Sequence, residues 1–178
     1  MRMVHLVNFQ DELAKRTEET EKVIRSFLPA EAGFAGTMAQ AMNYSMLAGG
    51  KRLRPMLIRE TYRLFDGKEE VVKPFMAGME MIHTHSLIHD DLPCMDNDDL
   101  RRGRPSCHKA FSESTAMLAG DVLLTEAFEV IANAPAAPQI CVAAARALGA
   151  GAGSCGMVYG QELDLKYEAL AATEEQLR

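Results

Sequence analysis

Helical periodicity runs through almost the whole of this 178-residue sequence, and no two-residue alternation lasts longer than a few positions. Apolar residues that recur every three or four positions indicate amphipathic helices, whereas a strand buried on one face needs alternation. Prolines and glycines divide the pattern into helix-sized segments. The sequence therefore predicts an all-α fold.

Capping residues and helix breakers give the expected segments their ends. Asn8 and Asp11 resemble a capping box, which predicts a first helix to about Phe27. The helices that follow are expected at about 35–48, 55–66, 74–91, 114–132 and 138–148, with a glycine-rich helix at 149–165. Thr173 and Gln176 resemble a capping box whose helix is present only as a first turn. We therefore expect residues 1–178 to be one all-α domain that is an incomplete N-terminal portion of a longer one.

Composition limits the classes of protein that the chain can represent. Apolar residues make up 48% and charged residues 25%, which is enough for one globular core. A net charge of -6 argues against general nucleic-acid binding. The four cysteines lack CxxC spacing, so we expect reduced thiols in a cytoplasmic protein. No uninterrupted apolar run approaches the ~20 residues of a membrane span, and none is predicted.

Charge is segregated into two blocks between Asp90 and Arg104, which reads DDLPCMDNDDLRRGR. Five carboxylates in ten positions are followed by three arginines in four. Crowded carboxylates raise one another's pKa unless a cation lies among them. Their oxygens suit Mg²⁺, with Mn²⁺ as a substitute, and arginines bind phosphate in a bidentate manner. This segment predicts a metal and phosphate site, whereas a solvated mixed-charge loop is the simpler alternative.

A second cluster lies in GGKRLRP, residues 49–55, where three cations occupy four positions before a helix. A helix N-terminus adds unpaired N–H groups, so this turn is expected to bind an anion such as diphosphate. Most basic turns are simply solvated. The interpretation gains support from His83 and Asp90, which lie seven residues apart and so share a helix face about 10 Å apart along its axis.

The histidines allow two other interpretations. His85 and His89 have a spacing found in zinc sites, but no glutamate follows His85 as in the HExxH motif. A metal-dependent phosphohydrolase would use His83, His89 and Asp90 in an HD-like arrangement. That class gives no reason for the GGKRLRP turn.

Three motifs together resemble a known family. HSLIHDDLPCMDNDDLRRG resembles the first aspartate-rich motif of the trans-prenyltransferases, the isoprenyl diphosphate synthases, and GGKRLRP and GQELDL resemble two further signatures in the same order. The gap between Asp91 and Asp96 is similar to that of bacterial short-chain enzymes of the farnesyl diphosphate synthase type. The resemblance implies a bundle of long helices around a central substrate cavity, a homodimer, and condensation of isopentenyl diphosphate with dimethylallyl or geranyl diphosphate.

The resemblance also assigns roles to residues. It implies Mg²⁺ ligation by Asp90 and Asp96, and an allylic diphosphate bound by Arg101. Isopentenyl diphosphate would be held by Lys51, Arg54, His83 and Arg102. A second tier at the metal site would comprise Asp91, Gln161 and Asp164. Product length would depend on His85 and Ser86, where the imidazole of His85 is the candidate cavity floor; this favours a farnesyl product and leaves a geranylgeranyl product open.

One departure from the family pattern bears on activity. The second aspartate-rich motif, DDxxD, and a Lys-Thr pair do not follow GQELDL in these 178 residues. The chain is then a fragment, one piece of a cleaved chain, or a shortened protein without catalysis, and alone it is expected to be inactive. A non-catalytic regulatory subunit of a heteromeric synthase is a further alternative, although the intact first-half motifs count against it.

Overall fold

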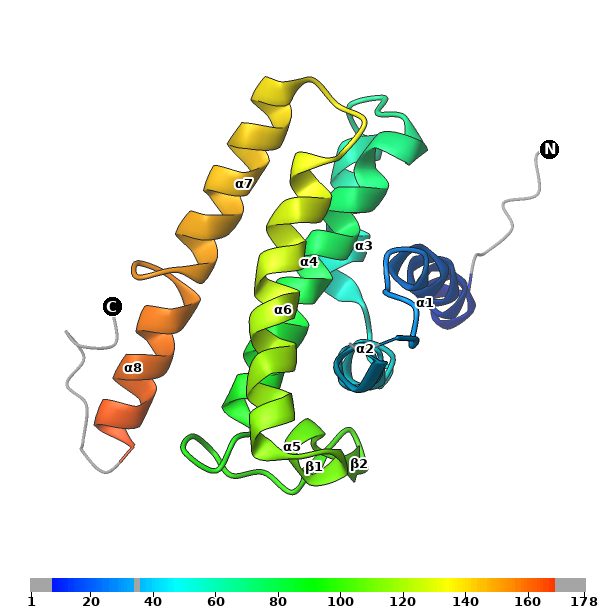
Figure 1. Cartoon of the computed structure of the whole chain (residues 1–178). Helices are drawn as coiled ribbons and strands as arrows, with labels where there is room; N and C mark the ends of the chain where they lie inside the picture. Colours follow the sequence, from blue (N-terminus) through cyan, green and yellow to red (C-terminus); the bar gives the residue numbers. More distant parts are fainter. Residues whose placement is uncertain (1–7, 34–35, 169–178) are drawn as a thin grey trace. The chain divides into compact units, whose positions relative to one another are not determined.

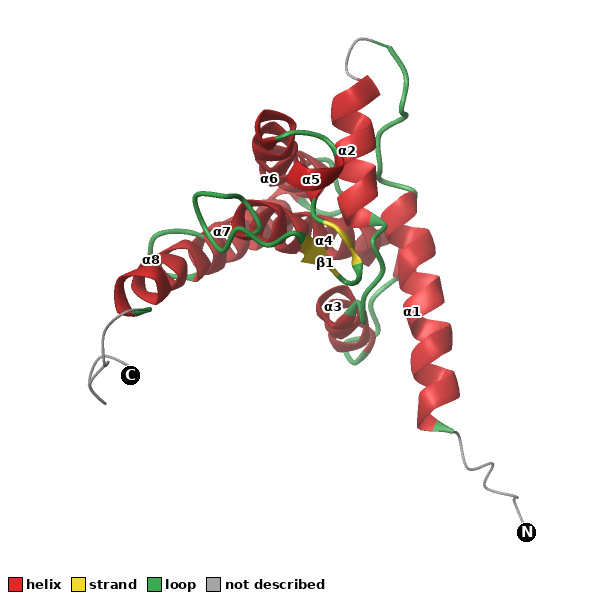
Figure 2. Cartoon of the chain, turned by 90° about the horizontal axis from the view of Figure 1, so that it is seen from below, coloured by secondary structure: helices red, strands yellow, loops and turns green. Residues whose placement is uncertain are grey.

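The computed structural model describes residues 8–33 and 36–168, and Figure 2 shows helices joined by loops with one small sheet. The chain separates into two compact units, Met1–Ala136 and Ala137–Arg178. The helices and strands of the first unit are α1 (Phe9–Arg25), α2 (Gly36–Met46), α3 (Leu53–Arg63), α4 (Glu69–Asp90), β1 (Leu100–Arg101), β2 (Arg104–Pro105), α5 (Cys107–Ala110) and α6 (Glu113–Ala132). The prediction of an all-α fold is confirmed.

Helix α4 is the centre of the first unit, because α1, α2, α3 and α6 all pack against it. Figure 1 shows α4 and α6 side by side along most of their length. The core contains several methionines, and Met76 and Met81 of α4 have no exposed surface. Gly78 lets α6 approach closely, since a Cβ there would lie 3.0 Å from the Ala127 carbonyl oxygen. A second glycine on α6, Gly120, leaves room for the His89 ring.

Helix α4 begins five residues earlier than the sequence predicted. Pro74 was expected to open the helix, but it lies inside it and is buried. Glu69 and Glu70 in the first turn complement the helix dipole. Glu69 is also held by Arg63 at 3.1 Å. These contacts stabilise a first turn that the position of the proline does not reveal.

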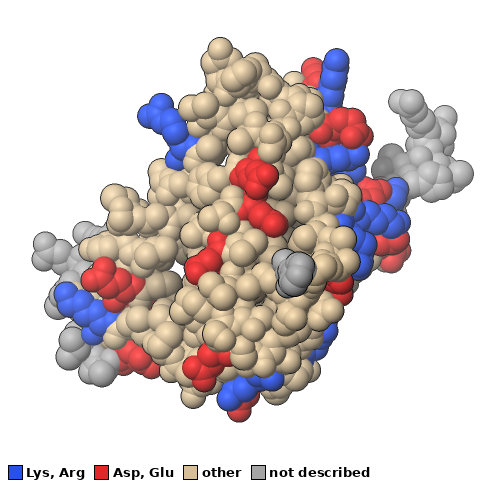
Figure 3. All heavy atoms as spheres, viewed as in Figure 1, with Lys and Arg blue, Asp and Glu red and all other residues tan. Residues whose placement is uncertain are grey.

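Ion pairs connect α1 to α3, and α3 to α4. Arg59 of α3 lies 2.9 Å from Glu19 of α1. Its Nε is also 2.7 Å from Glu69, close enough for an ion pair although not aligned for a hydrogen bond. Arg16 of α1 lies 2.7 Å from Glu60 of α3. Figure 3 shows basic and acidic side chains interleaved along the edge where α1 lies.

The second unit contains α7 (Pro138–Ala152) and α8 (Met157–Tyr167). Gly156 is required at the break between them, because a Cβ there would overlap the Gly151 carbonyl. Judged by length and composition alone, Pro138–Tyr167 is apolar enough to cross a membrane, since an 18-residue window within it has a mean hydropathy of 1.3. Length and composition are weak evidence when one segment alone among the described residues passes this test, so this does not show a membrane span. The expected helix at Thr173 lies outside the described residues.

Candidate functional site

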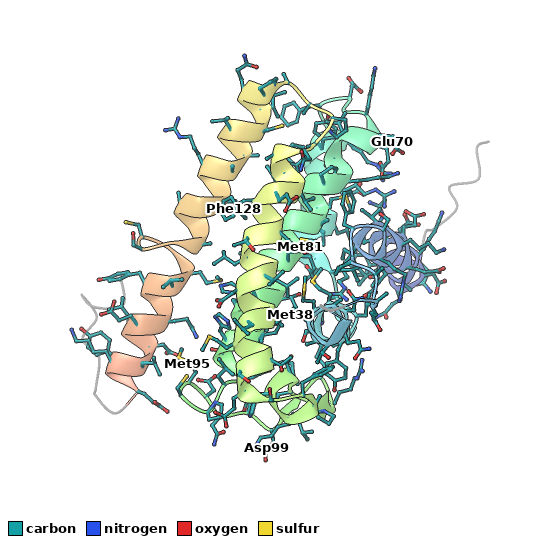
Figure 4. The ribbon with its side chains drawn as sticks, in the orientation of Figure 1. Met38, Glu70, Met81, Met95, Asp99 and Phe128 are labelled. Atoms are coloured by element: carbon teal, nitrogen blue, oxygen red, sulfur yellow. The ribbon has the colours of Figure 1, made fainter. Side chains whose placement is uncertain are left out.

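The aspartate-rich segment forms the loop that follows α4. Helix α4 ends at Asp90, one residue before the expected end at 91, because Pro93 lacks a backbone donor and disfavours helical geometry in the residue before it. The chain then turns back, so that the Asp96 amide donates to the Asp90 carbonyl at 3.0 Å. Figure 4 shows Glu70 near one end of α4 and Asp99 beyond the other. The loop thus gathers the predicted metal ligands, Asp90 and Asp96, at one end of the first unit.

Arg101 lies among three carboxylates of this loop. Its Nε donates to Asp91 at 2.8 Å, and its Nη2 contacts the same oxygen. Nη2 is also 3.4 Å from Asp90 and 3.6 Å from Asp98. The hydrogen bond that Arg101 donates to Asp91 raises the pKa of Arg101. Burial raises the pKa of the Asp91 carboxyl, although Arg101 opposes this effect. Asp91 therefore fixes Arg101, the residue assigned to the allylic diphosphate.

The donor set of the loop suits Mg²⁺. Among residues 8–33 and 36–168, no three His, Cys, Asp or Glu side chains are grouped so as to hold a metal ion by themselves. Mg²⁺ needs only one or two protein carboxylates, because water and phosphate oxygens complete its shell. Asp96 is exposed and the Asp90 side chain is 21% exposed, so both are open to such ligands. Carboxylates at a helix C-terminus also oppose the dipole, which favours a nearby cation.

A small hairpin that the sequence interpretation missed carries the arginines. Strands β1 and β2 are antiparallel, and the turn residues Arg102 and Gly103 have φ of 55° and 75°. Two positive φ values are typical of a type I′ turn, for which the Arg-Gly pair was only a weak signal. Tyr44 of α2 anchors the hairpin: its hydroxyl donates to Pro105 at 2.8 Å, and Arg104 lies 4.3 Å from its ring centroid. The hairpin thus places Arg101 at the end of β1 and Arg102 in the turn that follows.

The isopentenyl diphosphate residues converge on the turn between α2 and α3. Arg54 Nη1 lies 3.4 Å from His83 Nε2. Arg102 packs on Gly50, since a Cβ there would lie 2.6 Å from Arg102 Nη1. Lys51 is exposed in the same turn. We call Arg54, His83 and Arg102 the cation cluster.

Electrostatics agree with this arrangement of the cation cluster. Burial lowers the pKa of His83, and the charge of Arg54 lowers it further. Burial, followed by the charge of Arg52, lowers the pKa of Arg102. His83 is therefore mostly uncharged near neutral pH, and the positive charge of the cluster comes from Arg54 and Arg102, which favours an anion as ligand. The third cation of the GGKRLRP turn, Arg52, does not join the cluster but is buried.

Of the two predicted product-length residues, His85 is buried inside the first unit and Ser86 is half-buried. His85 is 8% exposed, and its Nδ1 donates to the Gly120 carbonyl of α6 at 3.1 Å. His89 Nε2 lies 3.0 Å from the Met117 carbonyl of the same helix. The Ser86 hydroxyl donates to the His83 carbonyl at 2.8 Å. The effect of His85 and Ser86 on product length stays a prediction.

The structure separates the other candidate residues. His83 contacts Arg54 of α3, whereas His89 contacts α6, so the HD-like grouping of both histidines with Asp90 is not formed. Gln161 and Asp164 lie on α8 in the second unit, where Gln161 is partly buried and Asp164 is exposed. Their contribution to the metal site stays a prediction.

Comparisons with known proteins identify the family. A polyprenyl synthetase family model matches residues 36–178. The chain is 46% identical over 157 residues to a farnesyl diphosphate synthase of Micrococcus luteus, covering 88% of this chain and 53% of that protein. It is 44% identical over 167 residues to a chloroplastic heterodimeric geranylgeranyl pyrophosphate synthase large subunit 1 of Arabidopsis thaliana, covering 92% and 44% respectively.

Solved structures support the same family assignment. An apo FPP/GFPP synthase from Zymomonas mobilis superimposes with a TM-score of 0.89 at 36% identity, covering 96% of this chain and 63% of that one. A geranyltransferase from Legionella pneumophila gives 0.86 at 42% identity, covering 94% and 60%. The chain therefore belongs to the polyprenyl synthetase family, as the motifs predicted. It spans about half the length of the curated relatives it matches.

Proposed function

We propose that the protein condenses isopentenyl diphosphate with an allylic diphosphate, dimethylallyl or geranyl, to give farnesyl diphosphate. One observation carries the proposal: α4 bears His83 within the cation cluster and, seven residues later, Asp90 beside Arg101. His83 and Asp90, which belong to the two expected diphosphate sites, thus lie about 10 Å apart along the axis of α4. The names of the similar proteins, which include farnesyl and geranylgeranyl synthases, support the class of substrate.

The residues of the chain suit each step of such a condensation. Arg54, His83 and Arg102 would bind isopentenyl diphosphate, while Arg101 would bind the allylic diphosphate. Asp90 and Asp96 would hold Mg²⁺, which neutralises charge on the leaving diphosphate when it is bound. The allylic C–O bond breaks and its electron pair leaves with diphosphate, which positive charge at Arg101 stabilises. The isopentenyl double bond then attacks the carbocation, and a proton is lost to the released diphosphate.

Three further properties belong to the same proposal. We expect a homodimer, which sedimentation equilibrium would test, and a cytoplasmic location. We also expect little condensation activity from the 178-residue chain by itself, because no second DDxxD motif is among its residues.

Product analysis tests the proposed function. The complete protein is incubated with Mg²⁺, labelled isopentenyl diphosphate and either allylic substrate, and the products are separated by chain length. The proposal predicts a prenyl diphosphate of farnesyl length, formed only when both substrates are present. Release of phosphate without carbon–carbon bond formation would contradict it and favour a phosphohydrolase. The same assay on the 178-residue chain tests its expected inactivity.

A further inference from the structure

Arg52 occupies the turn before α3, but its side chain points into the protein. The side chain has no exposed surface, and its Nη1 donates to Glu80 at 2.5 Å. Its Nε donates to Glu21 at 2.6 Å, and its Nη2 donates to the Met46 carbonyl at 2.6 Å. These partners lie on α4, on α1 and at the end of α2. One guanidinium therefore joins three helices beneath the turn that carries Lys51 and Arg54.

The backbone also ties Arg52 to this turn. Its φ of 50° is in the left-handed region, which non-glycine residues adopt at a cost. The cost is offset by the three hydrogen bonds of the side chain, all made to buried or partly buried acceptors. The conformation therefore depends on the guanidinium, and so does the direction in which Lys51 and Arg54 leave the turn.

Arg52 and Glu80 act in opposite directions on the cation cluster. Glu80 is 2% exposed and lies three residues before His83 on α4. Burial is the main cause that lowers the pKa of His83 and of Arg102. The charge of Arg52 lowers both pKa values further, whereas the charge of Glu80 raises them. Both charges are therefore felt where a diphosphate would bind.

We propose that Arg52 is a positioning residue for the cation cluster: it holds the turn of residues 49–54 in place and neutralises Glu80 beside the diphosphate. This inference rests on the proposed function of the cluster. Removing the guanidinium would leave a buried carboxylate without its partner and release the turn. Removing the charge of Glu80 would leave Arg52 bound to Glu21 and to Met46, with one negative charge fewer beside the cluster. Removing the guanidinium should therefore weaken diphosphate binding, whereas removing the charge of Glu80 should not.

Two measurements test the role of Arg52. The dissociation constant of inorganic diphosphate is measured by isothermal titration calorimetry for the wild type, Arg52→Met and Glu80→Gln. Hydrogen exchange of the peptide covering residues 47–56 is followed in the free proteins. Arg59→Met is the matched control, because Arg59 is also buried, with a side chain 9% exposed, and pairs with α1 and α4 through Glu19 and Glu69.

Arg52→Met should weaken diphosphate binding on the order of tenfold, which is about 1.4 kcal/mol. Glu80→Gln should bind diphosphate at least as tightly as the wild type, and Arg59→Met should bind it equally well. Exchange in residues 47–56 should rise in Arg52→Met and not in Arg59→Met. If Arg52→Met does not fold, Arg52→Lys replaces it, since lysine keeps the charge but cannot reach three partners; faster exchange is again expected.

Equal loss of affinity in Arg52→Met and Arg59→Met would overturn the inference, because general destabilisation would then explain both. Weaker binding by Glu80→Gln, or unchanged exchange in residues 47–56, would also overturn it. If the wild-type protein does not bind diphosphate at all, the proposed function fails. The exchange measurement still decides in that case whether Arg52 holds the turn.

Discussion

Replacing Gly50 with alanine should weaken isopentenyl diphosphate binding by displacing Arg102. A Cβ at Gly50 would lie 2.6 Å from Arg102 Nη1, 2.7 Å from its Cζ and 3.0 Å from its Nη2. The whole guanidinium would therefore have to leave its position against the turn. Since its neighbours Arg54 and His83 remain in place, the cation cluster would lose one of its three members.

The size of the effect follows from two separate costs. Gly50 has a φ of 127°, so alanine there is strained by about 1–3 kcal/mol, which lowers the free energy of unfolding. A charge-assisted phosphate contact is worth roughly 1.5–3 kcal/mol, so loss of the Arg102 contact should weaken binding by about tenfold to a hundredfold. The first cost affects stability and the second affects affinity, which allows them to be measured apart.

Gly49→Ala provides the matched control. Gly49 also has a positive φ, 85°, but a Cβ there would meet nothing within 4 Å. Titration calorimetry with isopentenyl diphosphate should show weakened binding only for Gly50→Ala, while thermal unfolding should show both variants destabilised. On an Arg102→Ala background, Gly50→Ala should have no further effect on affinity. Equal loss of affinity in Gly49→Ala and Gly50→Ala would show that displacement of Arg102 is not the cause of weaker binding.

Three other predictions concern α4. Asp90→Lys in the complete protein should lower kcat by orders of magnitude, because Mg²⁺ contacts matter most as diphosphate departs, and a near-normal kcat would remove Asp90 from the metal site. His85→Ala should shift products toward longer chains, and an unchanged distribution would remove His85 from the cavity floor. Burial lowers the pKa of His85 below 6.5, so the unfolded chain binds more protons than the folded one just below that pH. Stability should therefore fall as pH drops below about 6.5, and less so in His85→Gln, as denaturant unfolding between about pH 8 and pH 5 would show.

Most helix ends were predictable because local signals agreed with packing. Asn8 caps α1 by accepting from the Gln10 amide at 3.0 Å, and Ser112 caps α6 in the same way through Thr115. Pro74 misled the prediction because ion pairs from α3 stabilise a turn before it. These contacts join residues of two different helices, ten and six positions apart, so the pattern within α4 alone does not report them.

The candidate site was predictable as a set of residues but not as a geometry. Spacing in the sequence could not show that Arg52 points inward while Arg54 points toward His83, because both are arginines in one short turn. The difference comes from buried acceptors on three other helices. The β1–β2 hairpin was missed for a similar reason, since its anchor, Tyr44, lies 61 residues from Pro105.

We propose two distinct diphosphate sites that share α4: the cation cluster, to which α4 contributes His83, and the aspartate-rich loop, which begins at Asp90 where α4 ends. Calorimetric titration of isopentenyl diphosphate in the presence of EDTA distinguishes the two sites. Binding should persist without Mg²⁺, be lost in Arg54→Ala, and be unchanged in Asp90→Ala. Binding that requires Mg²⁺, is lost in Asp90→Ala and is unaffected by Arg54→Ala would contradict the proposal.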